Sequence, residues 1–216
     1  MASLLLSGVA LAAAGCGSTS APTPQALQLE RADLVTVCRT LSAAEPTVAS
    51  EVAATRAAWP LVVNGLPGSI DALTRQTVGR AVERADSLRV PGLFAEHPTA
   101  PITGPGSSLA GLFRGYVVLA SRGWEMIGAA IEQIEHGSAV AARFARANVA
   151  LYIESVYDAH FSLAQIGKKL LAGYKRQGGA SAFGASLTPA EVQGIAEVYS
   201  EAQDRLHPHT GVRLGS

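Results

Sequence analysis

Two carboxylates and a histidine on one predicted helix are the side chains with the clearest capacity for chemistry. Glu154 and Asp158 are one helical turn apart in the stretch 139–174, so they share one face of that helix. His160 lies on the opposite stripe. Both stripes also carry large apolar residues, which predicts a helix in the middle of a bundle with Glu154 and Asp158 buried. Buried carboxylates repel each other and need a counter-charge or a proton.

Arginine is the predicted counter-charge. The preceding stretch also reads as a helix, and a short His-Gly-Ser turn joins the two, which predicts an antiparallel hairpin. In that hairpin Arg122 lies near the level of Glu154, and Arg114 lies near Asp158 or His160. We therefore predict a buried polar cluster whose members are Glu154, Asp158, His160, Arg114 and Arg122.

A metal site is the alternative for the same carboxylates. Ferritin-like bundles hold metals with inward carboxylates and Glu-x-x-His pairs on facing helices. This chain has Glu132, Glu135 and His136 together but no Glu-x-x-His motif. These residues lie some five helical turns from His160, which is a poor match to a metal centre. We predict no metal ligand and no cofactor, and a metal- or redox-handling bundle stays the alternative function.

The sequence carries no signature of an enzyme or of a nucleic-acid binder. It contains no Gly-x-Ser-x-Gly, Ser-x-x-Lys or His-Glu-x-x-His motif. The 17 basic and 17 acidic residues give a formal net charge of zero, whereas a nucleic-acid binder normally has a basic excess on one face. We therefore predict a non-enzymatic protein with no catalytic residue and no nucleic-acid partner.

The elements that must position these side chains are predicted to be helices. Alanine is abundant and β-branched residues form no alternating runs. Helical segments are predicted at 25–44, 46–59, 69–88, 109–135, 139–174 and 188–206. Pro46 separates the first two, the Pro- and Gly-rich stretch 89–107 predicts a long irregular loop, and Thr188 with Glu191 predicts a capping box. The expected fold is all-α, an antiparallel bundle of four to five helices with a long Pro/Gly-rich loop.

An uncharged apolar run near the N-terminus ends at a cysteine. Residues 3–14 are too few to span a bilayer as a helix, which takes about 20 residues, but they suit the apolar region of a signal peptide. The run closes with Ala14, Gly15 and Cys16, and small polar residues and prolines follow. This pattern resembles the lipobox of bacterial lipoproteins. The resemblance implies cleavage before Cys16, a lipid on its thiol and a flexible tether.

The expected organisation follows from that resemblance. Residues 1–15 form a signal peptide, 16–24 carry the lipidated cysteine and tether, and 25–216 form a single helical-bundle domain. An uncleaved signal anchor or an ordinary secreted protein is the alternative. Abundant Ala, Gly and Arg are typical of high-GC coding such as that of actinobacteria. Cys38, left without a disulfide partner, is predicted to be a small buried hydrophobe.

These features predict a cell-envelope lipoprotein. Its location would be the extracytoplasmic face of the cell membrane, to which the lipid on Cys16 anchors it. Its role would be that of a non-enzymatic binding or interaction module. The expected partners are the membrane, through the lipid anchor, and a protein or small molecule, for which a groove between helices is the usual site.

Overall fold

The computed structural model describes residues 22–67, 69–204 and 206, and these residues form helices and loops with no strand among them. The longer helices are α1 (Pro24–Val63), α2 (Ala72–Ser87), α3 (Gly104–His136), α4 (Ala139–Arg176) and α6 (Pro189–Asp204). Three single helical turns complete the helical elements of the described residues: η1 (Gly92–Phe94), α5 (Ala180–Phe183) and η2 (Gly184–Ser186). The prediction of an all-α bundle is confirmed.

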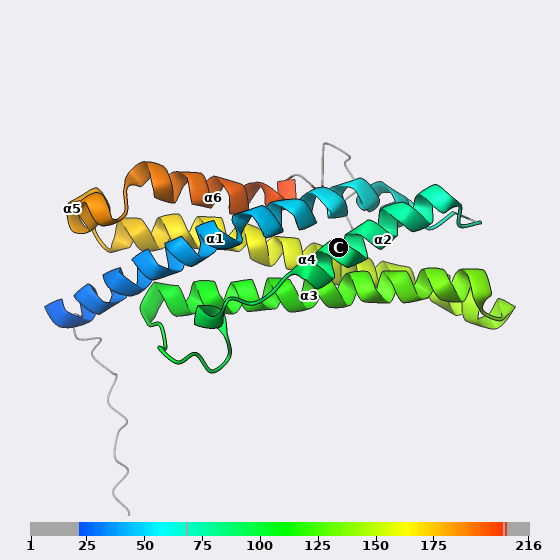
Figure 1. Ribbon diagram of the computed structural model, residues 1–216, viewed down its shortest axis with the longest axis horizontal. Coiled ribbons are helices and arrows are strands. Elements are labelled where there is room, and N and C mark those ends of the chain that lie inside the picture. The colour runs from blue at the N-terminus through cyan, green and yellow to red at the C-terminus, as the bar shows by residue number, and fades with distance from the viewer. Residues whose placement is uncertain (1–21, 68, 205, 207–216) are drawn as a thin grey trace, which may run out of the picture.

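Three long helices run the length of the bundle, and two shorter ones each complete one half of it (Figure 1). α3 and α4 form the predicted antiparallel hairpin, and α1 packs against both. α6 fills the space beside α1 and α4 in one half, and α2 packs on α1 and α3 in the other. We call these the α6 half and the α2 half. Each half is therefore a local four-helix arrangement that shares three of its helices with the other half.

α1 is continuous through Pro46, so the break predicted at that residue is wrong. An internal proline removes one backbone hydrogen bond and crowds the preceding turn, at a cost of about 3 kcal/mol. Packing on both sides offsets this cost, because Leu41 and Val48 are fully buried on either side of Pro46. The Tyr199 hydroxyl of α6 also donates a hydrogen bond of 2.7 Å to the Leu41 carbonyl, in the turn before the proline. Tertiary contacts thus outweigh the tendency of Pro46 to break the helix.

Side-chain caps fix the beginnings of α2, α4 and α6. The predicted capping box is present: the Thr188 hydroxyl accepts from the Glu191 backbone N–H, and the Thr188 N–H donates to the Glu191 carboxylate at 2.7 Å. Asp71 and Ser138 cap α2 and α4 in the same way. At the α3–α4 turn a Cβ on Gly137 would collide with the Gln133 carbonyl, so only glycine fits there. The tight turn holds α3 and α4 in their antiparallel register.

The buried apolar side chains of the described residues form two clusters, one in each half. The α6-half cluster includes Leu34, Phe113 and Tyr199. The α2-half cluster includes Trp59 and Trp124. On each long helix the two clusters meet within a few residues: Val52 and Ala58 on α1, Ala120 and Trp124 on α3, and Val156 and Ala159 on α4. The junction between the clusters is therefore a defined layer across the bundle.

α4 lies on the outside of the bundle, which corrects the prediction of a central helix. Its stripe through Val149, Ile153 and Val156 is buried, but the opposite stripe is open to solvent. Val140 and Phe144 on that opposite stripe are each 67% exposed. The neighbours of α4 are mainly α3 and α6, and these cover one face only. In the described part of the chain, no helix combines the length and apolar character needed to cross a membrane.

Candidate functional site

The predicted arginine–carboxylate cluster does not form. Gly123 packs against Val156, so Arg122 and Glu154 do lie at the same level of the hairpin. However, Glu154, Asp158 and Arg122 are all exposed. Since Val156 points inward, the helical rotation of about 100° per residue turns Glu154 and Asp158 to the opposite side. The prediction placed Arg122 and Glu154 at the correct level of the hairpin, but it placed Glu154 and Asp158 on the wrong face of α4.

Arg114 holds a loop instead of a carboxylate. Its guanidinium donates to the carbonyl of Phe94 at 2.7 Å and to that of Ala95 at 3.3 Å. Both carbonyls belong to the segment between α2 and α3, where Phe94 is fully buried in the single turn η1. Arg114 therefore fixes the long loop against α3.

His160 is the one member of the predicted cluster that is fully buried, and its partner comes from α1. The Glu51 carboxylate lies 3.3 Å from His160, measured from Oε2 to Nε2. Both side chains are 0% exposed. An ionisable pair in this position needs further polar partners to compensate for the loss of water.

Three more buried side chains supply those partners. The Tyr116 hydroxyl of α3 donates to Glu51 Oε2 at 2.5 Å, and the Thr55 hydroxyl donates to Glu51 Oε1 at 2.7 Å. The Trp124 indole N–H then donates to the Thr55 hydroxyl oxygen at 2.9 Å. We call this set, Glu51, Thr55, Tyr116, Trp124 and His160, the buried polar network. It ties α1, α3 and α4 together at the junction of the two apolar clusters.

The protonation state of His160 follows from its two neighbours. Nδ1 lies 2.8 Å from the Val156 carbonyl, which can only accept, so Nδ1 carries a hydrogen. Nε2 faces the Glu51 carboxylate without an aligned hydrogen bond. A lone pair on Nε2 would face that negative charge, so the stable state is an imidazolium beside a carboxylate.

The pKa directions agree with this assignment. Burial is the largest single effect and would lower the pKa of His160, but the Glu51 charge, the contact of Glu51 with Nε2 and the hydrogen bond to the Val156 carbonyl together raise that pKa above its usual value. Burial would raise the pKa of Glu51, but the His160 charge and the hydrogen bonds from Tyr116 and Thr55 lower it overall. Burial and the Glu51 charge raise the pKa of Tyr116 well above its usual value, so its hydroxyl keeps the proton that it donates. Both directions favour the ionised form of the pair.

The buried polar network joins helices and has no opening for a substrate. All five of its side chains are buried. Sequence reasoning did not single out Glu51, although the predicted helix 46–59 already contained it. Within that helix Glu51 lies on the same stripe as Val48, Val52 and Thr55, which are all buried.

An open groove lies between α1 and α6, and it is a separate feature from the network. Its cavity has a volume of about 560 Å³. The lining residues are Cys38, Arg39, Ser42, Glu45, Ala185, Ser186, Leu187, Ala190, Glu191, Gly194, Ile195 and Val198. Apolar side chains such as Leu187 and Ile195 are buried beneath it, while Arg39 and Glu191 are exposed. Such a groove can hold a small molecule by apolar contact and orient it by charge.

Cys38 lies against this groove but is not a nucleophile. It is buried, as predicted, and has no disulfide partner among the described residues. Burial, with a smaller effect of the Glu191 charge, raises the pKa of its thiol to about 12. Since the thiolate is the reactive form, Cys38 is inert at neutral pH.

No group of three or more His, Cys, Asp or Glu side chains within residues 22–67, 69–204 and 206 is arranged to hold a metal ion. Glu154 and Asp158 are exposed on one side of α4, while His160 is buried on the other. These three residues therefore cannot share one ion in this structure. Cys16 lies outside the described residues.

The fold and these features define the chain as an antiparallel helical bundle with a buried ion pair and an open interhelical groove. No family model, curated protein or solved structure matches the chain significantly.

Proposed function

We propose that this protein is a non-enzymatic binding module of the cell envelope, and that it holds a small molecule in the groove between α1 and α6. The groove is the observation that carries the proposal. Its volume of about 560 Å³ falls within the range of about 300–1,000 Å³ that is usual for ligand sites. The sequence around Cys16 supports the second part of the proposal, that a lipid on this cysteine tethers the module to the outer face of the cell membrane.

Small residues keep the groove open. Ser42 lies on the α1 side, and Ala190 and Gly194 lie on the α6 side. A Cβ added at Gly194 would have no atom within 4 Å. The space above α6 is therefore free for a ligand, and a larger side chain at Gly194 would occupy it without displacing the backbone.

The test of the groove replaces Gly194 by Leu. A matched control is Gly79→Leu on α2, because Gly79 is also an exposed helical glycine with nothing within 4 Å of an added Cβ. Each protein is recovered from the cells that make it and analysed by native mass spectrometry. We expect a bound small molecule on the wild type and on the Gly79→Leu variant, and its loss from the Gly194→Leu variant. Identical spectra for all three proteins would refute the groove as the binding site.

The tether has its own test. The intact mass of the protein extracted from membranes should correspond to a chain that begins at a diacylated Cys16. A Cys16→Ser variant should keep its first fifteen residues and lose the lipid. A mature species that begins at an unmodified Ala or Gly would refute the tether and leave the groove untouched.

A further inference from the structure

Four of the 17 basic residues of the chain, including every lysine, lie close together near the end of α4. All three lysines, Lys168, Lys169 and Lys175, lie near the end of α4, and Arg176 follows them. All four side chains are exposed. Between residues 159 and 190 the chain has no Asp or Glu. This segment therefore has no acidic residue of its own to balance these cations.

α1 and α3 add little negative charge to this end, whereas α6, which also begins here, carries Glu191 in its first turn. α1 and α3 begin beside the end of α4, and the α3 stretch 104–113 is uncharged (Figure 1). The α1 stretch 24–34 contributes Glu30, Arg31 and Asp33. With the four cations of 165–186, the three stretches carry five basic and two acidic residues, a net charge of 5 − 2 = +3. Since the whole chain has a net charge of zero, the remainder is net negative.

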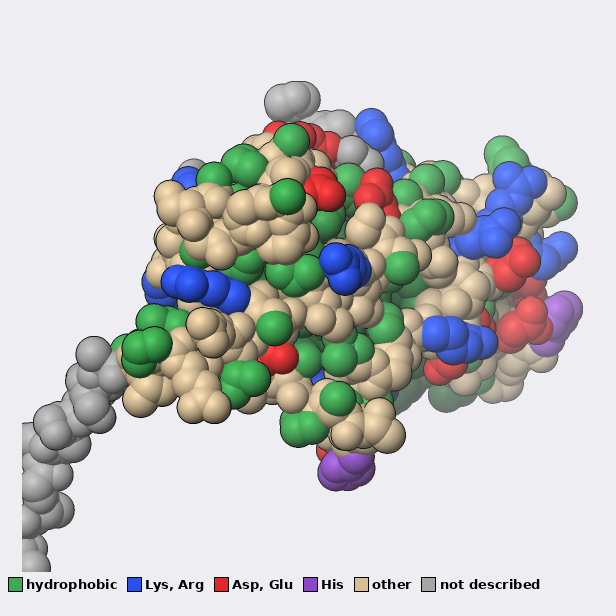
Figure 2. Space-filling view, turned by 60° about the vertical axis from the view of Figure 1, so that its left-hand side comes forward, with side chains coloured by type: hydrophobic (Ala, Val, Ile, Leu, Met, Phe, Trp, Pro, Cys, Tyr) green, Lys and Arg blue, Asp and Glu red, His purple; other side chains and the backbone are tan. Residues whose placement is uncertain are grey.

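The two acidic residues of these stretches, Glu30 and Asp33, are both engaged in hydrogen bonds. Glu30 accepts from the side-chain amide of Gln177. Asp33 accepts from the backbone N–H of Thr103 at 2.9 Å and from its hydroxyl at 2.6 Å. Figure 2, turned so that this end comes forward, has Lys and Arg side chains on its surface. We call the surface formed by Arg31, Lys168, Lys169, Lys175 and Arg176 the basic end.

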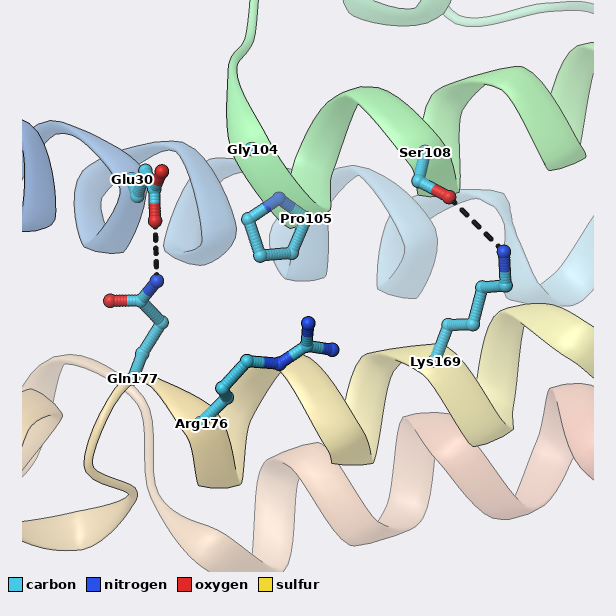
Figure 3. A pocket seen from close by; sticks show the side chains of 7 residues that line it. All are labelled: Glu30, Gly104, Pro105, Ser108, Lys169, Arg176 and Gln177. Atoms are coloured by element: carbon cyan, nitrogen blue, oxygen red, sulfur yellow. Dashed lines mark hydrogen bonds between the residues drawn. The ribbon is translucent and has the colours of Figure 1, made fainter. Parts of the chain in front are cut away.

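A hollow lies within the basic end. Its cavity has a volume of about 450 Å³ and is lined by Lys169 and Arg176 of α4, with Ser108 of α3 and Glu30 of α1 among the other residues. Lys169 donates to the Ser108 hydroxyl at 3.3 Å, and the Arg176 guanidinium extends toward the beginning of α3 (Figure 3). Two cations about two helical turns apart thus flank an open space of a size that accommodates a phosphate group.

The helix dipole accounts for only part of this arrangement. Lys175 and Arg176 are in the last turn of α4, where cations are favourable beside unpaired carbonyls. Lys168 and Lys169 lie about two turns earlier, and the dipole effect falls off within the last turn. A partner with negative charge explains all four cations.

We propose that the basic end lies against the anionic phospholipid headgroups of a membrane, with a lipid phosphate in the hollow between Lys169 and Arg176. This inference rests on the proposed tether. The described chain begins at Pro22, six residues after Cys16, and α1 starts at this same end. Six residues span at most about 20 Å, so a lipid on Cys16 keeps the basic end close to the membrane surface.

Vesicle sedimentation tests the proposal with the full chain. Neutral vesicles of phosphatidylcholine are compared with vesicles that also contain phosphatidylglycerol, at about 0.1 M salt, where the screening length is about 10 Å. The apolar run at residues 3–14 would bind both vesicle types alike, so the measured quantity is the ratio of anionic to neutral binding. We expect this ratio to be roughly tenfold or more for the wild type, because each cation near an anionic surface contributes about 1 kcal/mol.

Two charge variants distinguish binding through the basic end from non-specific electrostatic attraction to the anionic vesicles. The first variant is K168Q/K169Q/K175Q/R176Q, and its ratio should fall close to one. The matched control removes four exposed arginines elsewhere, as R56Q/R80Q/R84Q/R143Q, and should keep the wild-type ratio. Circular dichroism checks that both variants are folded.

Three outcomes would overturn the proposal. They are a wild-type ratio near one, equal losses in the two variants, or loss of the preference on adding inorganic phosphate at constant ionic strength. The last outcome would assign the hollow to free phosphate. Failure of the tether itself is seen independently, in the mass of the N-terminal residue.

Discussion

Removing the charge of Glu51 is the most direct perturbation of the buried polar network. Glu51→Gln keeps the size of the side chain and its ability to accept from Tyr116. It leaves His160 either charged without a partner or neutral in a site that fits the imidazolium. Breaking a buried ion pair from one side costs about 3–5 kcal/mol, and the retained hydrogen bonds place this variant near 3 kcal/mol. Against a typical stability of about 5–15 kcal/mol, such a loss is easily measured.

Urea unfolding followed by far-ultraviolet circular dichroism gives the free energy of unfolding. For a chain of this size the melting temperature should fall by about 6–12 °C, since each kcal/mol corresponds to about 2–4 °C. Glu154→Gln is the matched control, because it makes the same chemical change at an exposed position on α4. It should stay within about 0.5 kcal/mol of the wild type. An equal effect of the two variants would refute the reasoning.

A double-mutant cycle then isolates the pair. Glu51→Gln and His160→Gln are measured singly and together. If the two side chains are an ion pair, the double variant loses less stability than the sum of the single variants, by about 1 kcal/mol or more. Additive losses would mean that Glu51 acts through Tyr116 and Thr55 alone.

The remaining predictions concern pH, the thiol and the loop. Because the pKa of Glu51 is lowered, its contribution to stability is present above the ordinary glutamate pKa and is lost as the pH falls through the lowered pKa. Because the pKa of His160 is raised, its contribution to stability is present below the ordinary histidine pKa and is lost as the pH rises through the raised pKa. Unfolding measured across pH should therefore give a stability plateau between these limits that is flatter and lower in Glu51→Gln. Cys38 should not react with a thiol reagent in mildly alkaline solution until the protein is unfolded, because its pKa is about 12; rapid labelling of the native protein would contradict this. Arg114→Ala should cost about 1–2 kcal/mol and make the loop 88–103 more sensitive to protease, and an unchanged cleavage pattern would show that other contacts fix the loop.

The helix boundaries with local chemical signals were predictable from the sequence. The capping box of Thr188 and Glu191 depends only on residues three apart, and the turn at Gly137 follows from a glycine with no room for a side chain. The level of Arg122 against Glu154 was also predictable, because a tight turn fixes the register of an antiparallel pair. In each case the interaction is local or follows from a short connection.

Most of the candidate site could not be predicted from the sequence, because its contacts are neither local nor fixed by a short connection. Helical periodicity gave α4 two apolar stripes, and only the positions of α3 and α6 decide which of them is buried. Pro46 suggested a break, although burial of Leu41 and Val48 outweighs the cost of a proline within α1. Of the predicted cluster, His160 alone was correctly placed in the interior.

The basic end also depends on folding. The total of 17 basic and 17 acidic residues conceals a separation of charge, because the balancing acids lie on other parts of the surface. The run without acids from 159 to 190 was visible in the sequence. The fold shows in addition that α1 and α3 begin beside this run, and their first stretches add only Glu30, Arg31 and Asp33 to its charge.

The division of the apolar interior has a consequence for how the folding of this protein is observed. The chain has two tryptophans, and both Trp59 and Trp124 belong to the α2-half cluster. Intrinsic fluorescence therefore senses the surroundings of one half, while circular dichroism averages over every helix. α2 covers that half with small or medium side chains, Val78, Ala81 and Ala85, which favours early release of this helix. A fluorescence transition that precedes the dichroic one would then report the detachment of α2 rather than loss of the whole fold.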